Sequence, residues 1–375
     1  MSWAIWITGP PASGKSAIAR SVTEELEARG QRVKWLELDE VRATITPVPR
    51  YTDAERDLVY RALGYMATLL IEEGRPVIID ATAHRRVWRD LLRDAVSAFA
   101  EVQLLCPIEV CRERERSRTT GHAPRNIYAK ARQPGATVPG VDVQYEVALA
   151  PALRIDTARD SLASSVERVV SLADRLTAEA AAVPARPAPS GGLAWAIWIT
   201  GRPGSGKTTL AQLVWETLRE VGARVRLLDL APVQRLLVGG RTPSGEEQDL
   251  IHRVVAYSAK LLTEAGVSVI VDATAGRRVW RQTARALIPC FAEIQLLCPT
   301  ELCLERERAV RWGLTFETAR LAVASWRPSV EPPYEESLQP ELTLWTDECD
   351  VKSATARVLA TIQRVARSPR GVADR

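Results

Sequence analysis

Two glycine-rich stretches of the chain end in a lysine and a hydroxyl residue. They read Gly9-Pro10-Pro11-Ala12-Ser13-Gly14-Lys15-Ser16 and Gly201-Arg202-Pro203-Gly204-Ser205-Gly206-Lys207-Thr208. Each follows an apolar run and precedes residues with helical periodicity, which is the strand–loop–helix context of a phosphate-binding loop. In such a loop, successive backbone N–H groups and the positive end of the helix bind a polyphosphate. We predict that both stretches bind ATP, because a chance match would not be expected twice in one chain.

Other residues near these loops have the chemistry of phosphoryl transfer. Lys15 can reach the β- and γ-phosphates, and Ser16 can ligate Mg²⁺. Asp39 follows an apolar strand, where a carboxylate can orient a hydroxyl or accept its proton. We predict that Lys15 and Asp39 are catalytic, although a helix N-cap is the structural alternative for an aspartate in such a place. The predicted metal-binding residues are Ser16, Asp80, Thr208 and Asp272.

Arginines supply further positive charge. Arg42 and Arg56 are candidates to bind an anionic acceptor, and a solvated surface is the alternative for each. Arg114 lies in a charge run, residues 112–116, before the polar and irregular residues 117–143. Lids that close over phosphates carry arginines, so we predict that Arg114 contacts ATP. The alternative is a solvated helix face with i,i+4 ion pairs.

Composition favours a soluble, cytoplasmic protein that acts on small anions. The 375 residues are 46% hydrophobic and carry a net charge of +4, which gives no argument for a nucleic-acid partner. Six cysteines beside only three histidines are expected to be free thiols, not disulfides or a zinc site. No apolar run is long enough to span a membrane, and the N-terminus lacks the pattern of a signal peptide.

The chain is a tandem duplication. Gly9 corresponds to Gly201, an offset of 192 residues (201 − 9), and the same offset relates Asp80 to Asp272. A stretch of alanine, proline and glycine without apolar periodicity separates the copies and predicts a linker. The expected parts are a domain at residues 1–179, a linker at 180–192, a domain at 193–367 and a tail at 368–375.

Within the first copy, strand and helix patterns alternate. Strands are expected at residues 3–8, 32–38, 76–80, 101–106 and 153–156, and helices at 16–29, 53–73, 85–98, 108–118 and 161–178. This alternation predicts an α/β fold, with a parallel sheet of about five strands flanked by helices in each half. The tryptophans of the first strand in each copy are expected in the core: Trp3, Trp6, Trp195 and Trp198.

An ordered series of motifs follows the first loop. It comprises Leu36-Glu37-Leu38-Asp39-Glu40-Val41-Arg42, Tyr51-Thr52-Asp53-Ala54-Glu55-Arg56, Pro107-Ile108-Glu109-Val110-Cys111, Tyr128-Ala129-Lys130-Ala131-Arg132, and Gly140-Val141-Asp142 with Tyr145-Glu146. These are similar to L-D-G-D-N-V-R, F-[ST]-x-x-D-R, P-L-E-V-C, Y-K-K-A-R and F-T-G-I-D-x-P-Y-E of adenylyl-sulfate (APS) kinases. The first half, from about residue 3 to residue 157, therefore resembles the APS kinase family of P-loop kinases.

The resemblance implies transfer of the γ-phosphoryl group of ATP to the 3′-hydroxyl of APS, giving PAPS, with Mg²⁺ as cofactor, in sulfate activation. It implies that Arg42, Arg56 and Lys130 contact APS and that Tyr51 packs on its adenine. The partners that it implies are ATP and APS, with an ATP sulfurylase as a functional link. A homo-oligomer is compatible with it, and it includes no membrane partner.

Departures from the family pattern keep two other hypotheses open. Val59, Ala83 and Val138 stand where the family has asparagine, serine and phenylalanine. A kinase for another small-molecule or nucleic-acid hydroxyl is therefore the second hypothesis. The second half replaces Asp39, Arg42, Arg56 and Lys130 with Ala231, Gln234, Gln248 and Thr318. We expect this half to bind ATP without phosphorylating APS, and a nucleotide-binding regulatory protein is the third hypothesis.

Overall fold

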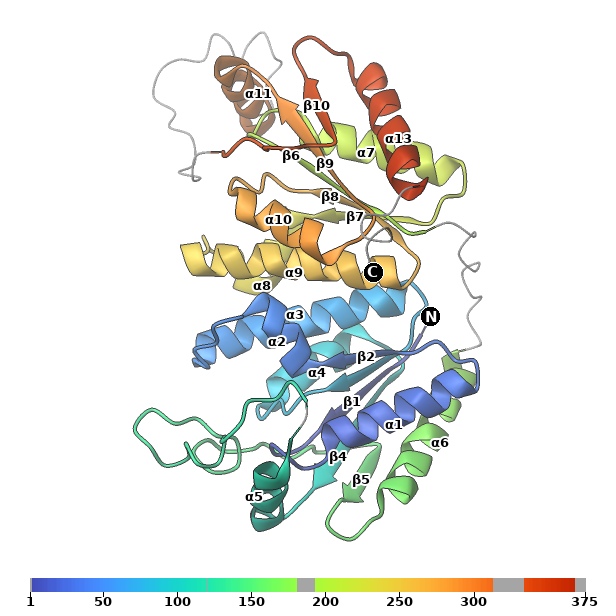
Figure 1. Cartoon of the computed structure of the whole chain (residues 1–375), viewed down its shortest axis with the longest axis vertical. Coiled ribbons are helices and arrows are strands. Elements are labelled where there is room, and N and C mark those ends of the chain that lie inside the picture. The colour runs from blue at the N-terminus through green and yellow to red at the C-terminus, as the bar shows by residue number, and fades with distance from the viewer. Residues whose placement is uncertain (1, 120, 181–192, 313–333, 368–375) are drawn as a thin grey trace. The chain divides into compact units, whose positions relative to one another are not determined.

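The computed structural model describes residues 2–119, 121–180, 193–312 and 334–367. They belong to two compact units, residues 1–187 and 188–375. Each unit contains one five-stranded sheet with helices around it (Figure 1). The expected linker and tail lie outside the described residues except for Ala180, which is the last residue of a helix. The domain boundaries expected from the sequence stay a prediction.

The first unit alternates strands and helices, as its sequence predicted. Its strands are β1 (Ala4–Thr8), β2 (Lys34–Glu37), β3 (Val77–Asp80), β4 (Phe99–Leu105) and β5 (Leu153–Asp156). Its helices are α1 (Lys15–Ala28), α2 (Leu38–Ile45), α3 (Asp53–Glu72), α4 (Arg86–Ala95), α5 (Ile108–Ser117) and α6 (Leu162–Ala180). All strand pairs are parallel, in the order β2-β3-β1-β4-β5.

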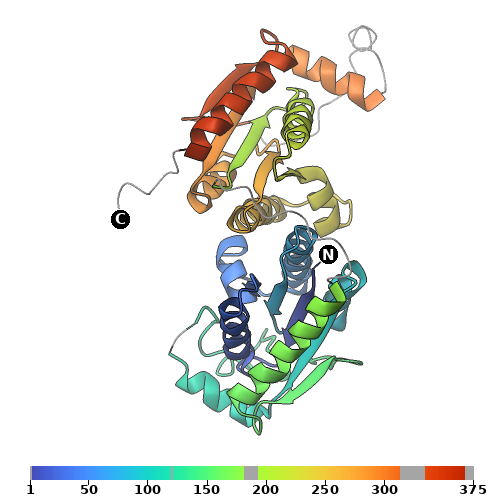
Figure 2. The ribbon, with the colours of Figure 1, turned by 90° about the vertical axis from the view of Figure 1, so that its right-hand side faces the viewer.

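Strand β1 lies at the centre of this sheet because it is apolar on both faces. All five of its residues are buried, as are the four residues of β3. Helices α1 and α6 pack together on one face of the sheet, and α3 and α4 pack together on the other (Figure 2). Parallel strands bring their carboxyl ends to one edge of the sheet, so the loops after β1, β2 and β3 meet there.

The second unit repeats this architecture. Its strands are β6 (Ala196–Gly201), β7 (Val225–Asp229), β8 (Ser268–Asp272), β9 (Phe291–Leu297) and β10 (Leu342–Trp345). Its helices are α7 (Lys207–Glu220), α8 (Leu230–Val238), α9 (Gly245–Glu264), α10 (Arg278–Leu287), α11 (Thr300–Trp312) and α13 (Val351–Arg367). The strand order is β10-β9-β6-β8-β7, again all parallel. The predicted fold class is confirmed for both halves.

One helix of the first unit, α2, was absent from the sequence-based prediction, and α8 is its counterpart in the second unit. The expected strand at residues 32–38 ends at Glu37, and α2 begins at the next residue. Its buried residues Leu38, Val41 and Ile45 have helical spacing, but the preceding Glu37 makes no side-chain capping bond. The missing N-cap explains why the run reads as the end of a strand.

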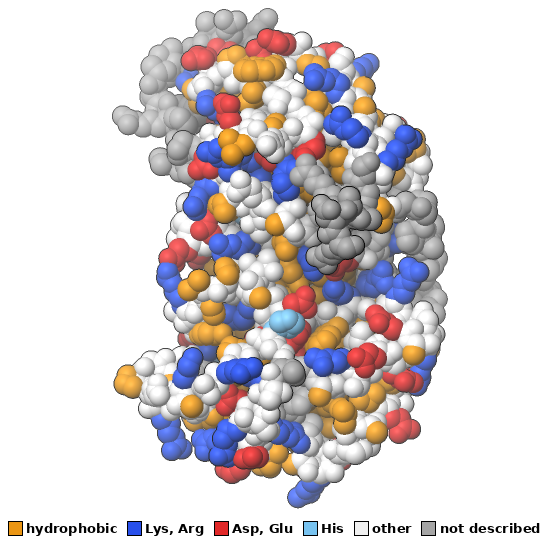
Figure 3. All heavy atoms as spheres, in the orientation of Figure 1, with side chains coloured by type: hydrophobic (Ala, Val, Ile, Leu, Met, Phe, Trp, Pro, Cys, Tyr) orange, Lys and Arg blue, Asp and Glu red, His pale blue; other side chains and the backbone are white. Residues whose placement is uncertain are grey.

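Other expectations from composition agree with the structure. The four tryptophans of the first strands are buried, with Trp195 the most exposed at 7%. All six cysteines are free. None of the helices in the described residues is long and apolar enough to cross a bilayer. On the face shown in Figure 3, acidic and basic side chains are mixed.

Candidate active site

The first phosphate-binding loop joins β1 to α1 in a shape that needs glycine. A Cβ on Gly9 would lie 2.7 Å from the Ser13 hydroxyl oxygen and 3.1 Å from the backbone oxygen of Leu104. Gly14 has φ 98° and is the N-cap of α1, without a side-chain capping bond. The first-turn N–H groups of α1 therefore have no side-chain cap and remain available to a phosphate.

Lys15 lies inside this loop. Its Nζ donates hydrogen bonds to the backbone oxygens of Gly9 (3.3 Å) and Pro10 (3.0 Å), and the residue is only 8% exposed. Burial lowers the pKa of the Lys15 ammonium, and the carboxylates of Asp80 and Asp39 oppose that shift. An ammonium held this way can turn from loop carbonyls to phosphate oxygens when a nucleotide binds.

Asp80 ends β3 beside the loop and is 4% exposed. Burial raises its pKa to about 6, against the effects of Lys15 and of a hydrogen bond with Ser16. Its Oδ2 has no hydrogen-bond partner among the described residues. The capping alternative is wrong for Asp80, because the N-cap of the following helix α4 is Arg85. A buried carboxylate oxygen beside a serine hydroxyl fits Mg²⁺, which prefers oxygen ligands.

Asp39 is the second residue of α2, one position after the helix begins. The N-cap of α2 is Glu37, so the capping alternative is wrong for Asp39 as well. Burial raises the pKa of the Asp39 carboxyl, and the positive charges of Lys15 and Arg42 oppose this. A carboxylate with a raised pKa accepts a proton more readily than an ordinary aspartate.

A cavity of about 530 Å³ joins the loop to the predicted acceptor-binding residues. It is lined by residues of the loop, including Lys15 and Ser16, and by the predicted substrate residues Arg42, Tyr51, Arg56 and Lys130. Asp39 and Asp80 line the same cavity. The structure thus brings together, around one cavity, the catalytic, metal and substrate residues predicted for the first half.

The two arginines on the acceptor side are buried. Arg42 is 6% exposed, pairs with Glu55 at 3.0 Å and lies over the ring of Tyr51, 5.1 Å from its centroid. Arg56 is 7% exposed, and its Nη2 donates to the backbone oxygen of Thr137 at 2.9 Å. The solvated-surface alternative is therefore wrong for both. Buried guanidinium groups that face a cavity favour an anionic ligand.

The irregular segment after α5 closes one side of the cavity. It runs to β5 without a named helix or strand in its described residues, as predicted. The Tyr128 hydroxyl donates to the backbone oxygen of Pro11 at 2.8 Å, and the His122 Nδ1 lies 2.9 Å from a carboxylate oxygen of Glu37. These contacts fasten the segment to the first loop and to the end of β2.

Arg114 lies on α5 behind the loop, not on the irregular segment. Its Nη1 donates to the Thr157 hydroxyl at 3.1 Å, and Thr157 in turn donates to the backbone oxygen of Ser13 at 2.9 Å. Arg114 lines the cavity, so the solvated-helix alternative is wrong. Its contact with ATP stays a prediction.

Sequence reasoning missed three residues of this site. Thr157 directly follows β5 and belongs to no recognised motif, and its hydrogen bond to the loop depends on tertiary packing. His84 and Tyr60 line the cavity, and burial lowers the pKa of His84 to about 4. The stretch Asp80-Ala81-Thr82-Ala83-His84-Arg85-Arg86 departs from the family pattern, and that departure was the available indication of His84.

The second unit keeps the loop but not the acceptor residues. Lys207 donates to the backbone oxygen of Arg202 at 2.9 Å, and Asp272 has a hydrogen bond with Thr208. Ala231, Gln234 and Gln248 hold the positions of Asp39, Arg42 and Arg56. Thr318, at the position of Lys130, lies outside the described residues.

Comparisons with known proteins follow the same division into two copies. The family model described as adenylylsulphate kinase matches residues 1–156 and again residues 193–345. The chain is similar to a probable adenylyl-sulfate kinase of Archaeoglobus fulgidus, with 34% identity over 158 residues, 42% of this chain and 97% of that protein. It is also similar to a probable bifunctional SAT/APS kinase of Sorangium cellulosum, at 28% identity over 46% of this chain and 28% of that protein.

A solved APS kinase structure from Mycobacterium tuberculosis, in complex with AMPPNP and APS, covers 46% of this chain and 98% of its own, at 28% identity and a TM-score of 0.41. The two matches of the family model together span more than half of the chain. The protein therefore belongs to the adenylylsulphate kinase family and is a kinase that uses ATP with Mg²⁺.

Proposed function

We propose that the first unit transfers the γ-phosphoryl group of ATP to the 3′-hydroxyl of APS, giving PAPS and ADP. The observation that carries this proposal is the single cavity shared by the phosphate-binding loop, Asp39 and the buried arginines Arg42 and Arg56. A nucleotide at the loop and an anionic acceptor at the arginines would face each other across Asp39. Holding both substrates in line supplies most of what this reaction needs.

In this proposal Asp39 accepts the proton of the acceptor hydroxyl. The hydroxyl oxygen bonds to the γ-phosphorus while the bond from that phosphorus to the β-phosphate oxygen breaks, and ADP leaves. Lys15 stabilises the negative charge on the phosphates. Arg114 holds Thr157, and through it the loop, in a fixed position. Ser16 and Asp80 would hold Mg²⁺, which supplies charge neutralisation on the β- and γ-phosphates when bound.

The acceptor assignment is supported by where the departures lie. Val59 and Ala83 are both 0% exposed and are not among the residues that line the cavity. Only Val138, of the three departures, lines it. Two of the three substitutions therefore change the packing around the cavity and not its surface. The second hypothesis, a different hydroxyl acceptor, is favoured by one observation, the presence of His84 on the cavity wall.

An enzyme that makes APS must supply the acceptor in this proposal. The bifunctional SAT/APS kinase among the relatives carries both names in one protein, which supports a functional link to a sulfurylase. Six free cysteines agree with a reducing compartment such as the cytoplasm, which we propose with it.

The test is a PAPS-formation assay on the whole chain with Mg·ATP and APS. Two variants install residues that the second copy carries, Asp39→Ala and Arg56→Gln. We expect Asp39→Ala to lower kcat by a factor of about 10² to 10⁴. We expect Arg56→Gln to raise KM for APS more than KM for ATP. Lys352→Ala, an exposed residue of α13, is the matched control and should behave as the unaltered protein.

Two results would contradict the proposal. One is an unaltered kcat in Asp39→Ala, which would show that Asp39 is not the proton acceptor. The other is binding of ATP by the unaltered protein without PAPS formation, which would direct the search to other hydroxyl substrates.

A further inference from the structure

The arginine–threonine contact of the first site is repeated in the second unit. Arg306 of α11 donates from Nη1 to the Thr346 hydroxyl at 3.0 Å, as Arg114 does to Thr157 at 3.1 Å. The backbone oxygen of Thr346 also accepts from Arg306, at 3.1 Å, as that of Thr157 does from Arg114, at 2.5 Å. The residue behind the loop and its partner at the end of the last strand are therefore both present. The Thr346 hydroxyl, however, donates to the backbone oxygen of Leu297 at 3.5 Å, whereas the Thr157 hydroxyl donates to that of Ser13 in the loop at 2.9 Å.

The second loop shares several backbone features with the first. Gly206 has φ 91° and is the N-cap of α7, without a side-chain capping bond. A Cβ on Gly201 would lie 2.6 Å from the backbone oxygen of Leu296. The loop differs from the first at Gly204, where a Cβ would meet the backbone oxygen of Cys303 and where the first loop carries Ala12. Ser205 is 0% exposed, and its hydroxyl oxygen has no hydrogen-bond partner in the part of the chain that the structure describes. Lys207, 8% exposed, points into the loop.

The metal-binding pair is present as well. Asp272 ends β8 and is 5% exposed, and burial raises the pKa of its carboxyl against the hydrogen bond with Thr208. The corresponding pair in the first unit is Asp80 with Ser16. A hydroxyl beside a buried carboxylate on a phosphate-binding loop fits Mg²⁺ in complex with a nucleotide.

The residues proposed to bind and activate the acceptor in the first unit are, in contrast, replaced by uncharged residues in the second. Ala231 cannot accept a proton, and Gln234 carries no positive charge. The nearest carboxylate in sequence, Asp229, is the N-cap of α8 and accepts a hydrogen bond from the backbone N–H of Ala231 at 2.9 Å. Asp229 is therefore engaged as a helix cap, a role that Glu37 does not fill with its side chain in the first unit.

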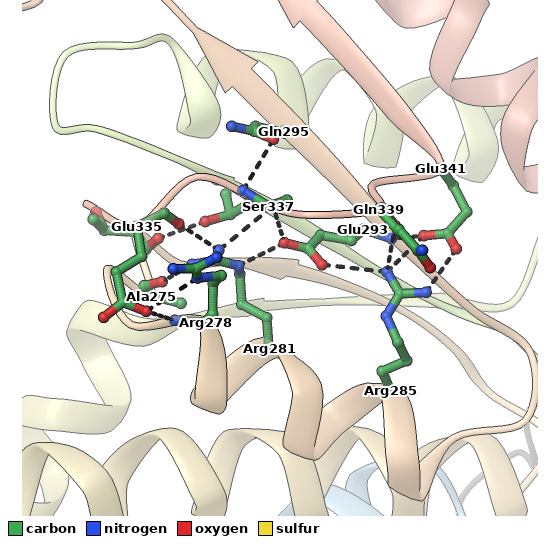
Figure 4. Close-up of polar contacts among 12 residues, drawn as sticks. Ala275, Arg278, Arg281, Arg285, Glu293, Gln295, Glu335, Ser337, Gln339 and Glu341 are labelled. Atoms are coloured by element: carbon green, nitrogen blue, oxygen red, sulfur yellow. Dashed lines mark hydrogen bonds and ion pairs between the residues drawn. The ribbon is translucent and has the colours of Figure 1, made fainter.

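The second unit keeps its buried ion pairs although it lacks the charged acceptor residues. Figure 4 shows Arg281 and Arg285 of α10 pointing toward Glu293 of β9, with Arg285 also paired to Glu341 at 2.6 Å. The first unit has the corresponding pair Arg89–Glu101 but carries an alanine where Glu341 stands. The second unit therefore has an additional partly buried ion pair, between Arg285 of α10 and Glu341, the residue that precedes β10. The second loop also differs in sequence, with Arg202, Gly204 and Thr208 at the positions of Pro10, Ala12 and Ser16, but it keeps the lysine and a hydroxyl residue. The charges of Asp39, Arg42 and Arg56, in contrast, are absent from the corresponding positions.

We propose that the second unit is a separate binding site for a magnesium-bound nucleoside triphosphate, and that it holds this nucleotide without transferring its phosphoryl group. The division of the site into a nucleotide side and an acceptor side rests on the proposed function of the first unit. Nucleotide binding by the second unit is inferred independently of that function, from the second loop and its metal pair.

Equilibrium dialysis of the whole chain against Mg·AMPPNP, a nucleotide that cannot donate its γ-phosphoryl group in this way, tests the proposal. We expect two equivalents bound per chain, and one equivalent in each of Lys15→Ala and Lys207→Ala. The double variant should bind none. Lys352→Ala removes a lysine from the same unit away from the loop and should still bind two.

A stoichiometry of one that Lys15→Ala abolishes would overturn the proposal. Asp272→Asn provides a second variant in case Lys207→Ala fails to fold, and it should remove the magnesium dependence of one of the two bound equivalents. Dependence of both equivalents on magnesium in that variant would also overturn the proposal. The outcome does not depend on APS: a chain that binds two nucleotides but makes no PAPS would contradict the proposed function and leave this inference intact.

Incubation of Lys15→Ala with Mg·ATP and APS tests the second half of the proposal. We expect one nucleotide bound and no PAPS or ADP formed above the uncatalysed rate. PAPS formation by Lys15→Ala at the rate of the unaltered protein would show that the second unit is itself a catalyst.

Discussion

We predict that the ionised carboxylate of Asp80, the proposed Mg²⁺ ligand, lowers the stability of the first unit when no nucleotide is bound. The difference between its ordinary pKa of 3.8 and the value of about 6 that burial produces is a free-energy cost on its charged form. At about 1.4 kcal/mol for each pH unit, this cost is about 3 kcal/mol when the carboxylate is ionised in both the folded and the unfolded chain. Asp80→Asn keeps the shape of the side chain and removes the charge.

The pH dependence has a defined sign. The folded state binds the Asp80 proton more tightly than the unfolded chain, so stability is highest below pH 3.8 and is lost as pH rises through about 6. Without nucleotide, Asp80→Asn should stabilise the first unit by up to about 3 kcal/mol at pH 7.5, and by roughly half of that at pH 5. The value is an upper limit, because a buried amide has its own hydrogen-bonding needs.

Hydrogen exchange of peptides from β1 and β3, measured on the whole chain, reports the opening free energy of the first unit by itself. Mg·ATP should slow this exchange in the unaltered protein and have much less effect in Asp80→Asn. Asp272→Asn makes the same change in the second unit and should leave the exchange of β1 and β3 unaltered. The reasoning fails if Asp80→Asn is less stable than the unaltered protein at pH 7.5, or if the difference does not change with pH.

Three further predictions concern single positions. Gly9→Ala should abolish nucleotide binding by the first loop, because its Cβ would meet Ser13 and Leu104 at 2.7–3.1 Å. At Gly64 in α3 an added Cβ would have no neighbouring atom within 4 Å. As a control, Gly64→Ala should instead stabilise the chain by about 0.5–1 kcal/mol in urea unfolding. Arg114→Met should raise KM for ATP by about tenfold or more, because it releases Thr157 from the loop, and an unchanged KM would contradict that role. His84→Ala should raise KM for the acceptor and leave KM for ATP unchanged in the same assay; because the pKa of His84 is held at about 4, this difference should not vary between pH 6 and 8.

The elements that carry continuous apolar runs could be predicted from the sequence. β1 and β3 were expected within one residue of their observed limits, because each run is buried on both faces. β1 ends directly before the loop that begins at Gly9, and β3 ends at Asp80. α2 could not be predicted from its own copy, since it follows β2 directly and has no capping side chain. In the second copy the corresponding helix begins with Asp229 as N-cap and has Pro232 in its first turn. The sequence pattern that marks the start of a helix is therefore present in the second copy and absent from the first.

The residues of the site were easier to predict than their connections. Lys15 and Ser16 follow from a local motif, so their positions depend on few other parts of the chain. The ion pair of Arg42 with Glu55 depends on how α2 packs on α3, and the chain from Arg114 through Thr157 to the loop joins residues 144 positions apart. No pattern in one sequence encodes contacts of that kind, because packing between distant elements decides them.

The two copies differ in which buried charged residues they keep, and this difference indicates which ligand each residue binds. In the first unit, Arg42 and Arg56 are almost completely buried, and keeping a charge in such a place is costly. The second unit has replaced both with glutamines, yet it retains Lys207 and Asp272, which are buried to a similar degree. Burial raises the pKa of Asp272 just as it does that of Asp80, so removing Asp272 would relieve the same kind of cost. A unit that had lost both ligands would gain stability by losing both sets of charges. Loss of the acceptor set alone is the pattern expected of a unit that still binds a magnesium nucleotide.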